Sequence, residues 1–303
     1  MIKITNLKYV LVVVTILMCS QHTYSQLTDL ARIEYTYFPQ DDSENTFKRF
    51  RVFANYPIQL SEDGYLVIGA EYRNVDLDLG DELPFIKDEI QEFSNYAATI
   101  GYTNTMKNDW RYAFQGELRL ASNFTDGIVS EDYILGGSVY FIKDRTGDEE
   151  NAPEKPWRLV LGLNYSTTAG RPFPLPFINY YREFATDWSF GLGVPKSNIK
   201  WEFVPNHELQ GFVTLDGFFA NIQEDLVVTQ SNNDQDVGNN ISMTTLLSGI
   251  GYSWEFIEHF EFYLYFGHTI INNIRIEDDK NNEVYTINDQ NNFYGRTGIK
   301  LKI

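Results

Sequence analysis

The feature that most constrains this chain is an alternation of apolar and polar residues with a period of two. From Trp110 to Leu120 the even positions are apolar or glycine, whereas the odd positions include Arg111, Glu117 and Arg119. The same alternation returns in 157–166, 260–266 and 299–303. Strands of soluble sandwiches average about five or six residues, and a tilted strand that crosses a bilayer needs about nine to eleven. The length of the segments therefore favours membrane-spanning strands.

The links between these segments alternate between short and long, as they do in outer-membrane barrels with short periplasmic turns and longer extracellular loops. The short links are 61–64, 107–109, 185–187, 205–207 and 257–259. The longer polar links are 39–46, 77–92, 123–132, 222–240 and 272–292, with briefer ones near Gly170 and Lys196. One link assigned to the periplasmic side, 144–156, is longer than this rule expects.

The pattern predicts an all-β fold, a transmembrane antiparallel β-barrel of about 14 strands, an even number as closed barrels prefer. The alternative is about 12 strands, if the short segments flanking Pro195 are not separate spanning strands. Closure leaves no unpaired strand edge in hydrocarbon.

The tryptophans give a third indication of a barrel, because amphipathic rings gather at membrane interfaces. All five stand next to predicted periplasmic turns at positions of lipid-facing parity. They form the predicted interface girdle: Trp110, Trp157, Trp188, Trp201 and Trp254.

The N-terminal residues have the order of a secretory signal peptide. Lys3 and Lys8 precede an apolar run over 9–18, and a polar stretch ends at Ser25. We expect residues 1–25 to be cleaved, leaving a single barrel domain at 26–303 in the outer membrane of a Gram-negative bacterium. The only cysteine, Cys19, leaves with the peptide, so the mature chain has no disulfide.

The net charge of the chain limits the kinds of partner that it can bind. A formal net charge of -18 gives no attraction to a phosphate backbone, so nucleic acid is not an expected partner. The expected partners are outer-membrane lipid, the barrel-assembly machinery during insertion, and small polar solutes. The sequence makes no prediction of oligomeric state.

One stretch also resembles a known group of proteins. Together with the signal peptide, the residues from Pro172 to Phe177 that lead into Tyr180 and Tyr181, and those from Trp188 to Pro195, are similar to an uncharacterised outer-membrane β-barrel family of Gram-negative bacteria. That family is classed as a domain of unknown function. The resemblance implies the fold and the location, and it implies no activity.

Inward parity assigns a mixed set of charged and polar side chains to the lumen. The predicted lumen-lining residues are Arg49, Arg51, Glu71, Arg73, Arg111, Gln115, Glu117, Arg119, Arg158, Asp216, Glu261, Arg296 and Lys300. Such residues can line a water-filled path and set its ion preference, or they can pair across strands and fill the interior. The first reading predicts a passive pore for small polar solutes. The second predicts a structural or surface-interaction barrel without an open channel, which the long extracellular loops also favour.

An enzyme is the least favoured function. Hairpin pairing about the 257–259 turn places Ser248 opposite His268 on the lipid-facing side, a pair that a membrane-embedded lipid hydrolase could use. No Asp or Asn falls behind His268 in this register. The histidines show no metal-ligand spacing, and the chain has no phosphate loop or dinucleotide fingerprint, so no metal or cofactor is predicted.

Overall fold

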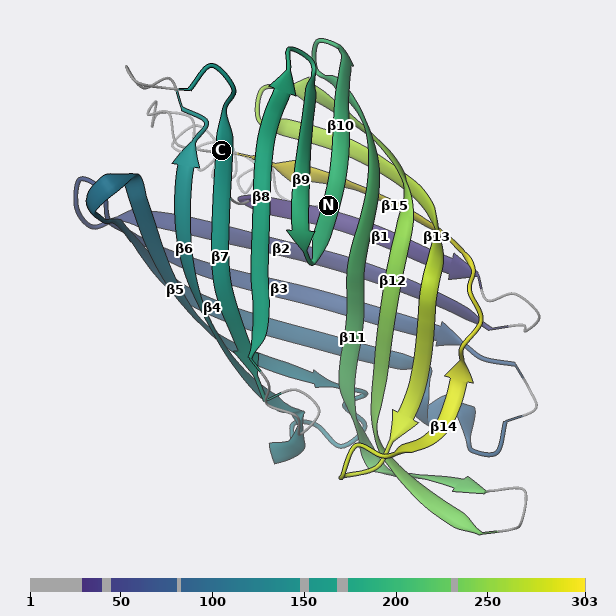
Figure 1. Cartoon of the computed structure of the whole chain (residues 1–303). Coiled ribbons are helices and arrows are strands. Elements are labelled where there is room, and N and C mark those ends of the chain that lie inside the picture. The colour runs from purple at the N-terminus through teal and green to yellow at the C-terminus, as the bar shows by residue number, and fades with distance from the viewer. Residues whose placement is uncertain are drawn as a thin grey trace, which may run out of the picture.

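The computed structural model describes residues 29–39, 45–80, 83–147, 153–167, 174–229 and 234–302. Strands dominate it (Figure 1). The strands are β1 (Ala31–Pro39), β2 (Thr46–Gln59), β3 (Tyr65–Asp78), β4 (Glu92–Thr105), β5 (Trp110–Ser122), β6 (Tyr133–Arg145), β7 (Trp157–Ser166), β8 (Leu175–Ala185), β9 (Trp188–Val194), β10 (Lys196–Val204), β11 (His207–Thr229), β12 (Gln235–Ile257), β13 (Phe260–Glu277), β14 (Glu283–Asn288) and β15 (Phe293–Leu301). Three short 3-10 turns interrupt the loops: η1 (Lys87–Ile90), η2 (Lys107–Asp109) and η3 (Ser130–Asp132). No helix in the described ranges is long and apolar enough to cross a bilayer.

The strands close into an antiparallel barrel. Each strand from β1 to β13 pairs with the next, β13 pairs with β15, and β15 pairs with β1. The short strand β14 pairs with the outer part of β13, in line with β15, so the ring contains 14 strands. The predicted fold class is confirmed, and so is the strand count. The segments flanking Pro195 are separate strands, β9 and β10.

Two of the links predicted to be loops are largely strand. β11 and β12 extend to Thr229 and from Gln235, inside the predicted 222–240 loop, and β13 and β14 occupy part of 272–292. Burial explains the difference, because Leu226, Val228 and Ile276 belong to the same buried hydrophobic cluster as Phe47 and Phe218. The prediction treated polar composition as loop, but alternate residues of the β11 and β13 extensions are apolar and buried: Leu226, Val228, Ile274 and Ile276.

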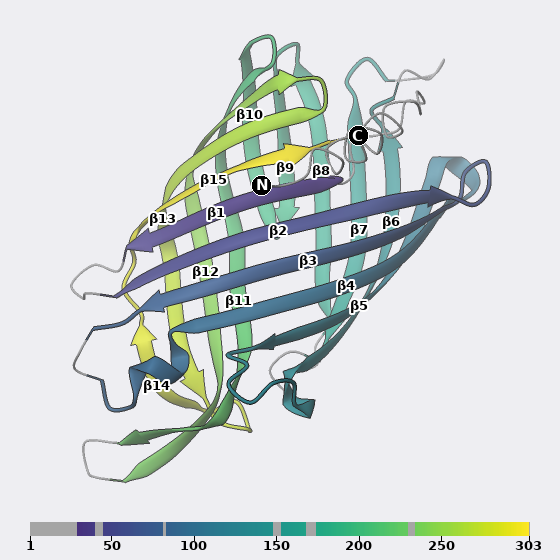
Figure 2. The ribbon, with the colours of Figure 1, turned by 180° about the vertical axis from the view of Figure 1, so that it is seen from behind.

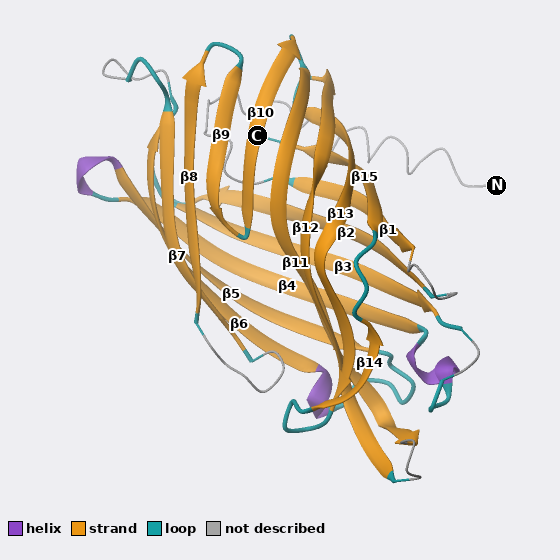
Figure 3. Ribbon diagram, turned by 45° about the vertical axis from the view of Figure 1, so that its right-hand side comes forward, coloured by secondary structure: helices purple, strands orange, loops and turns teal. Residues whose placement is uncertain are grey.

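The barrel has two walls that cross at a large angle. In Figure 1 strands β7 to β13 run steeply across the front, and in Figure 2 strands β1 to β5 run obliquely across the opposite side. Figure 3 shows the same crossing with the 3-10 turns confined to the ends of the strands. Side chains from both walls meet between them, and this contact decides how much of the lumen is open.

Candidate functional site in the lumen

The outer surface of the barrel is apolar at alternate positions along each strand. Ile33, Ile100, Leu163 and Phe266 are among the large hydrophobic side chains that are exposed there. The five tryptophans lie at the ends of strands that the turns join, and two pairs of rings stack: Trp188 with Trp201, and Trp254 with His207. A band of this kind is the surface that a bilayer requires.

The two walls are joined across the lumen by a buried ion-pair network. Arg49 of β2 makes two hydrogen bonds to Asp216 of β11, at 2.9 and 2.7 Å, and Arg49 is only 3% exposed. Arg296 of β15 also pairs with Asp216, and its Nε donates to Thr36 of β1 at 3.1 Å. The carboxylate therefore ties β2 and β15 to β11, and Arg296 extends the network to β1. Solute cannot pass between Asp216 and these two arginines without breaking the bonds.

Other predicted lumen charges pair with close neighbours. Glu71 lies between Arg51 and Arg73, at 2.6 and 2.7 Å. At the periplasmic end Glu261 pairs with Lys300 at 2.7 Å and also with Lys302. Burial would lower the pKa of Lys302, but the carboxylates of Glu261 and Glu255 offset it and hold that pKa above its ordinary value. These charged side chains point inward, and they form ion pairs with one another.

Aromatic side chains fill the extracellular half of the lumen. Phe218 of β11 contacts Phe47 of β2 and Phe93 of β4, with ring centroids 6.4 and 5.7 Å apart. Phe38 of β1 lies between Phe47 and Tyr294, at 5.4 Å from each. Because the rings come from opposite walls, this half of the lumen is a packed hydrophobic core.

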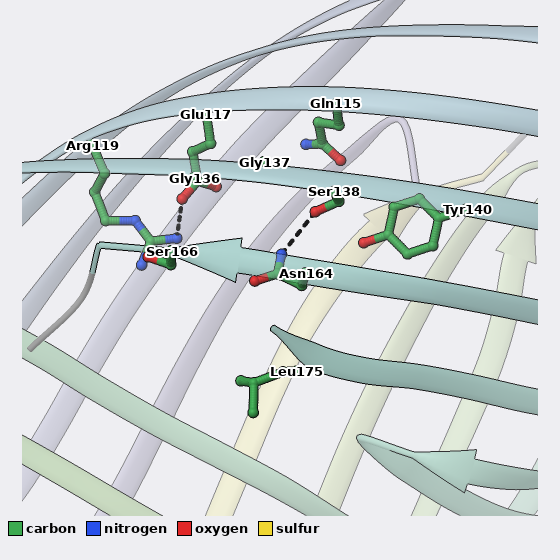
Figure 4. Close-up of a pocket in the computed structure, with 10 residues that line it drawn as sticks. All are labelled: Gln115, Glu117, Arg119, Gly136, Gly137, Ser138, Tyr140, Asn164, Ser166 and Leu175. Carbon is green, nitrogen blue, oxygen red and sulfur yellow. Dashed lines mark hydrogen bonds and ion pairs between the residues drawn. The ribbon is translucent and has the colours of Figure 1, made fainter. Parts of the chain in front are cut away.

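One cavity lies on the flank between β5 and β8. A cavity of about 550 Å³, here called the side compartment, is lined by Gln115, Glu117, Arg119, Gly136, Gly137, Ser138, Tyr140, Asn164, Ser166 and Leu175 (Figure 4). Arg119 pairs with Glu117 at 2.6 Å, and the Asn164 amide donates to the Ser138 hydroxyl at 2.7 Å. In the described part of the chain, the side-chain amide of Gln115 and the hydroxyl of Tyr140 make no hydrogen bond. The compartment thus offers one carboxylate, one guanidinium and several neutral polar groups.

Two predicted lumen residues lie toward the periplasmic ends of their strands. Arg111 donates to the backbone oxygen of Asp63 in the β2–β3 turn, at 3.2 Å. Arg158 donates to Asp144 at 2.7 Å, beside the unexpectedly long β6–β7 link. Both arginines brace a periplasmic connection.

Selection by charge missed seven of the ten residues that line the side compartment. Ser138, Tyr140, Asn164 and Ser166 stand at inward positions of β6 and β7, which the period-two pattern already defines. They were not predicted because only charged residues and Gln115 were chosen. Neutral polar residues at inward positions, next to the glycines 136 and 137, were the available signal.

The register places Ser248 directly opposite His268 on β12 and β13. The Nδ1 atom of His268 lies 2.7 Å from the backbone oxygen of Thr269, and the imidazole packs edge-on against Phe293. Among the described residues no carboxylate contacts the imidazole. The two side chains are neighbours without the third group that would orient a catalytic histidine.

A closed barrel with an apolar outer band and a polar, partly bridged lumen has the architecture of an outer-membrane protein. The chain belongs to the family described as "Domain of unknown function (DUF6268)", whose model matches residues 69–302. This agrees with the resemblance to an uncharacterised barrel family. A comparison with curated proteins finds no match.

Several solved structures align with this chain at low sequence identity and with TM-scores below 0.5. The KdgM porin aligns with 8% identity and a TM-score of 0.37, covering 90% of this chain and 99% of that chain. LpxR from Salmonella typhimurium aligns with 9% identity and a TM-score of 0.38, over 90% and 100%. The Pseudomonas putida toluene transporter TodX aligns with 10% identity and a TM-score of 0.36, over 91% and 89%. Similarity at this level gives no indication of this chain's function.

Proposed function

We propose that this protein is an outer-membrane barrel that passes small polar solutes along its side compartment, between β5 and β8. Export would depend on residues 1–25 as a cleaved signal peptide, and insertion on the barrel-assembly machinery. The observation that carries the proposal is the contrast inside the barrel. Side chains bridge the lumen at Asp216 and at Phe218, whereas the side compartment keeps about 550 Å³ and has charged and neutral polar side chains in its lining.

The lining indicates the kind of solute. Glu117 and Arg119 neutralise each other, so the compartment has no strong preference for one sign of charge. Hydroxyl and amide groups of Ser138, Tyr140 and Asn164 can replace part of a hydration shell. Small neutral or zwitterionic solutes fit this chemistry best.

Single-channel conductance in a planar bilayer tests the proposal. The mature chain, 26–303, is compared with Arg119→Gln and with the matched control Arg51→Gln. Both arginines point inward and pair with a glutamate, at 2.6 Å in each case, but only Arg119 lines the side compartment. We expect a small conductance whose selectivity shifts toward cations in Arg119→Gln and not in Arg51→Gln.

The result that would contradict the proposal is insertion without conductance, or an equal shift in both variants. Insertion without conductance would favour the second candidate, a structural barrel with a closed lumen. The packed rings of Phe38, Phe47, Phe93 and Phe218 specifically favour that candidate.

A further inference from the structure

Among the described residues, no strand completes the barrel wall next to the side compartment. The β9–β10 hairpin turns at Pro195, and its last pairs are Val194 with Ile178 on β8 and Lys196 with Thr214 on β11. β8 begins three residues further out, at Leu175, and β11 continues to Thr229. Figure 1 shows the hairpin ending about halfway along its neighbours. Within the described residues, no strand pairs with the facing edges of β8 and β11 just beyond Pro195.

This opening lies within the apolar band. Ile178 pairs with Val194 on one side and with Leu161 on the other, so these three residues mark the level of the hairpin tip. Beyond that level β7 still presents Leu163 and Tyr165 outward, 51% and 46% exposed. The tip therefore ends inside the hydrocarbon layer, short of the extracellular interface.

The far end of the opening is closed by the β5–β6 link. Asn221 of β11 meets Ser122 of β5, whose hydroxyl donates to the Asn221 backbone oxygen at 3.2 Å. Asn123 then accepts a hydrogen bond from the backbone of Gln223 at 3.0 Å. Nearer the tip, the Gly217 N–H donates to the Asp216 side chain at 2.8 Å. The strands that the structure describes leave a short window between the Pro195 turn and Asn221.

A window of this kind has a physical requirement. An unpaired backbone group in hydrocarbon costs several kcal/mol, and irregular backbone at membrane depth is tolerated where it lines a water-filled cavity. The side compartment satisfies this requirement, because Leu175, at the rim on β8, is one of its lining residues. The polar interior of the barrel thus borders the lipid at this position.

We propose that the window is a lateral portal through which the side compartment takes a single-chain amphiphile with a zwitterionic head group. The proposal uses the same compartment as the proposed function and therefore depends on it. The head group would exchange partners with the Glu117–Arg119 pair, and Asn164 would hydrogen-bond its polar atoms. The apolar chain would pass Leu175 and lie against Val194 and Leu215, both exposed on the outer surface. The volume of about 550 Å³ is within the range of roughly 300–1,000 Å³ typical of ligand pockets.

Fluorescence quenching in phosphatidylcholine vesicles tests the portal. A bimane label is placed on Asn164→Cys, inside the compartment, and on Thr99→Cys as the control. Thr99 also points inward, but its strand is paired on both sides, with Gly69 of β3 and Glu117 of β5. Lipids brominated on their acyl chains should quench the Asn164 label several-fold more than the Thr99 label. Filling the rim with Leu175→Trp should remove most of that difference.

The head-group preference is tested with dodecylphosphocholine, which carries no bromine. It should relieve the quenching at Asn164, and it should do so more weakly in the double variant Glu117→Gln, Arg119→Gln. Dodecyl sulfate, with an anionic head, should relieve it less than dodecylphosphocholine does; equal relief by the two would overturn the zwitterion preference.

The two proposals fail in different ways. If aqueous iodide quenches the Asn164 label but brominated lipid quenches it no more than the Thr99 label, the portal is refuted and the polar path remains. If neither quencher reaches Asn164 and no conductance is seen, both proposals are refuted.

Discussion

Replacing Asp216 by asparagine tests whether the two walls are held together across the lumen. The change keeps the shape of the side chain and removes its charge, while Arg49 and Arg296 stay buried. The nearest remaining carboxylate is Glu34, 3.7 Å from Arg296. Breaking a buried pair by removing one partner costs about 3–5 kcal/mol, because the other charge is left uncompensated. With a slope of about 2 kcal/mol per molar urea, the unfolding midpoint should fall by roughly 1.5–2.5 M.

The assay is equilibrium unfolding in urea from vesicles, followed by tryptophan fluorescence. Asp109→Asn is the matched control, because Asp109 pairs with Arg145 at 2.6 Å but is about half exposed. A surface pair of this kind contributes about 1 kcal/mol or less. Equal midpoint shifts in the two variants would refute the reasoning, since Asp216 would then contribute no more than a surface carboxylate.

Three further changes test other contacts. Gly251→Ala would place a Cβ 2.5 Å from the Tyr265 ring on the neighbouring strand. We therefore expect the free energy of unfolding to fall by about 1–3 kcal/mol in the same assay. The control Gly116→Ala should have little effect, because its Cβ would meet no atom closer than 3.9 Å. Asp132→Ala removes the buried carboxylate that accepts hydrogen bonds from Asn221 and Gln223, at 2.9 and 2.8 Å. The β5–β6 link should then become sensitive to protease. Unchanged cleavage would show that other contacts hold the link. Ser248→Ala should leave phospholipid hydrolysis at the level of the unaltered chain, because His268 has no described carboxylate partner, and any loss of hydrolysis would revive the enzyme hypothesis.

The period-two pattern assigns residues to the inner face by parity, but it does not predict what those residues meet there. Parity alone places Arg49 and Asp216 on the same inner surface. Their contact joins residues 167 positions apart and depends on how the closed ring is flattened. No local pattern encodes that shape. The prediction of mixed lumen charges was therefore compatible with an open path and with a bridged interior, and the contacts of Asp216 favour the second for this part of the barrel.

A local signal of the hydrophobic filling was present in the sequence. Phe218, Phe219 and Ala220 are consecutive and apolar, so both faces of β11 are hydrophobic there. A strand with lipid on one side and water on the other should alternate at this point. Loss of the alternation at the extracellular end indicates that the inner face packs against protein, as Phe218 does against Phe47 and Phe93.

The number of strands and the filled lumen together account for the side compartment. Side chains just fill a barrel of about eight strands, and the diameter grows with the strand number. A ring of 14 strands can be bridged by direct contacts such as Arg49 with Asp216 only if it is flattened there. The remaining circumference must then bow outward on one flank. The contact of Asn221 with Ser122 draws β11 toward β5, which leaves β6 to β10 as the bowed part. The side compartment and the short β9–β10 hairpin both lie in that part, so the space available for a ligand follows from closing a large ring around a packed core.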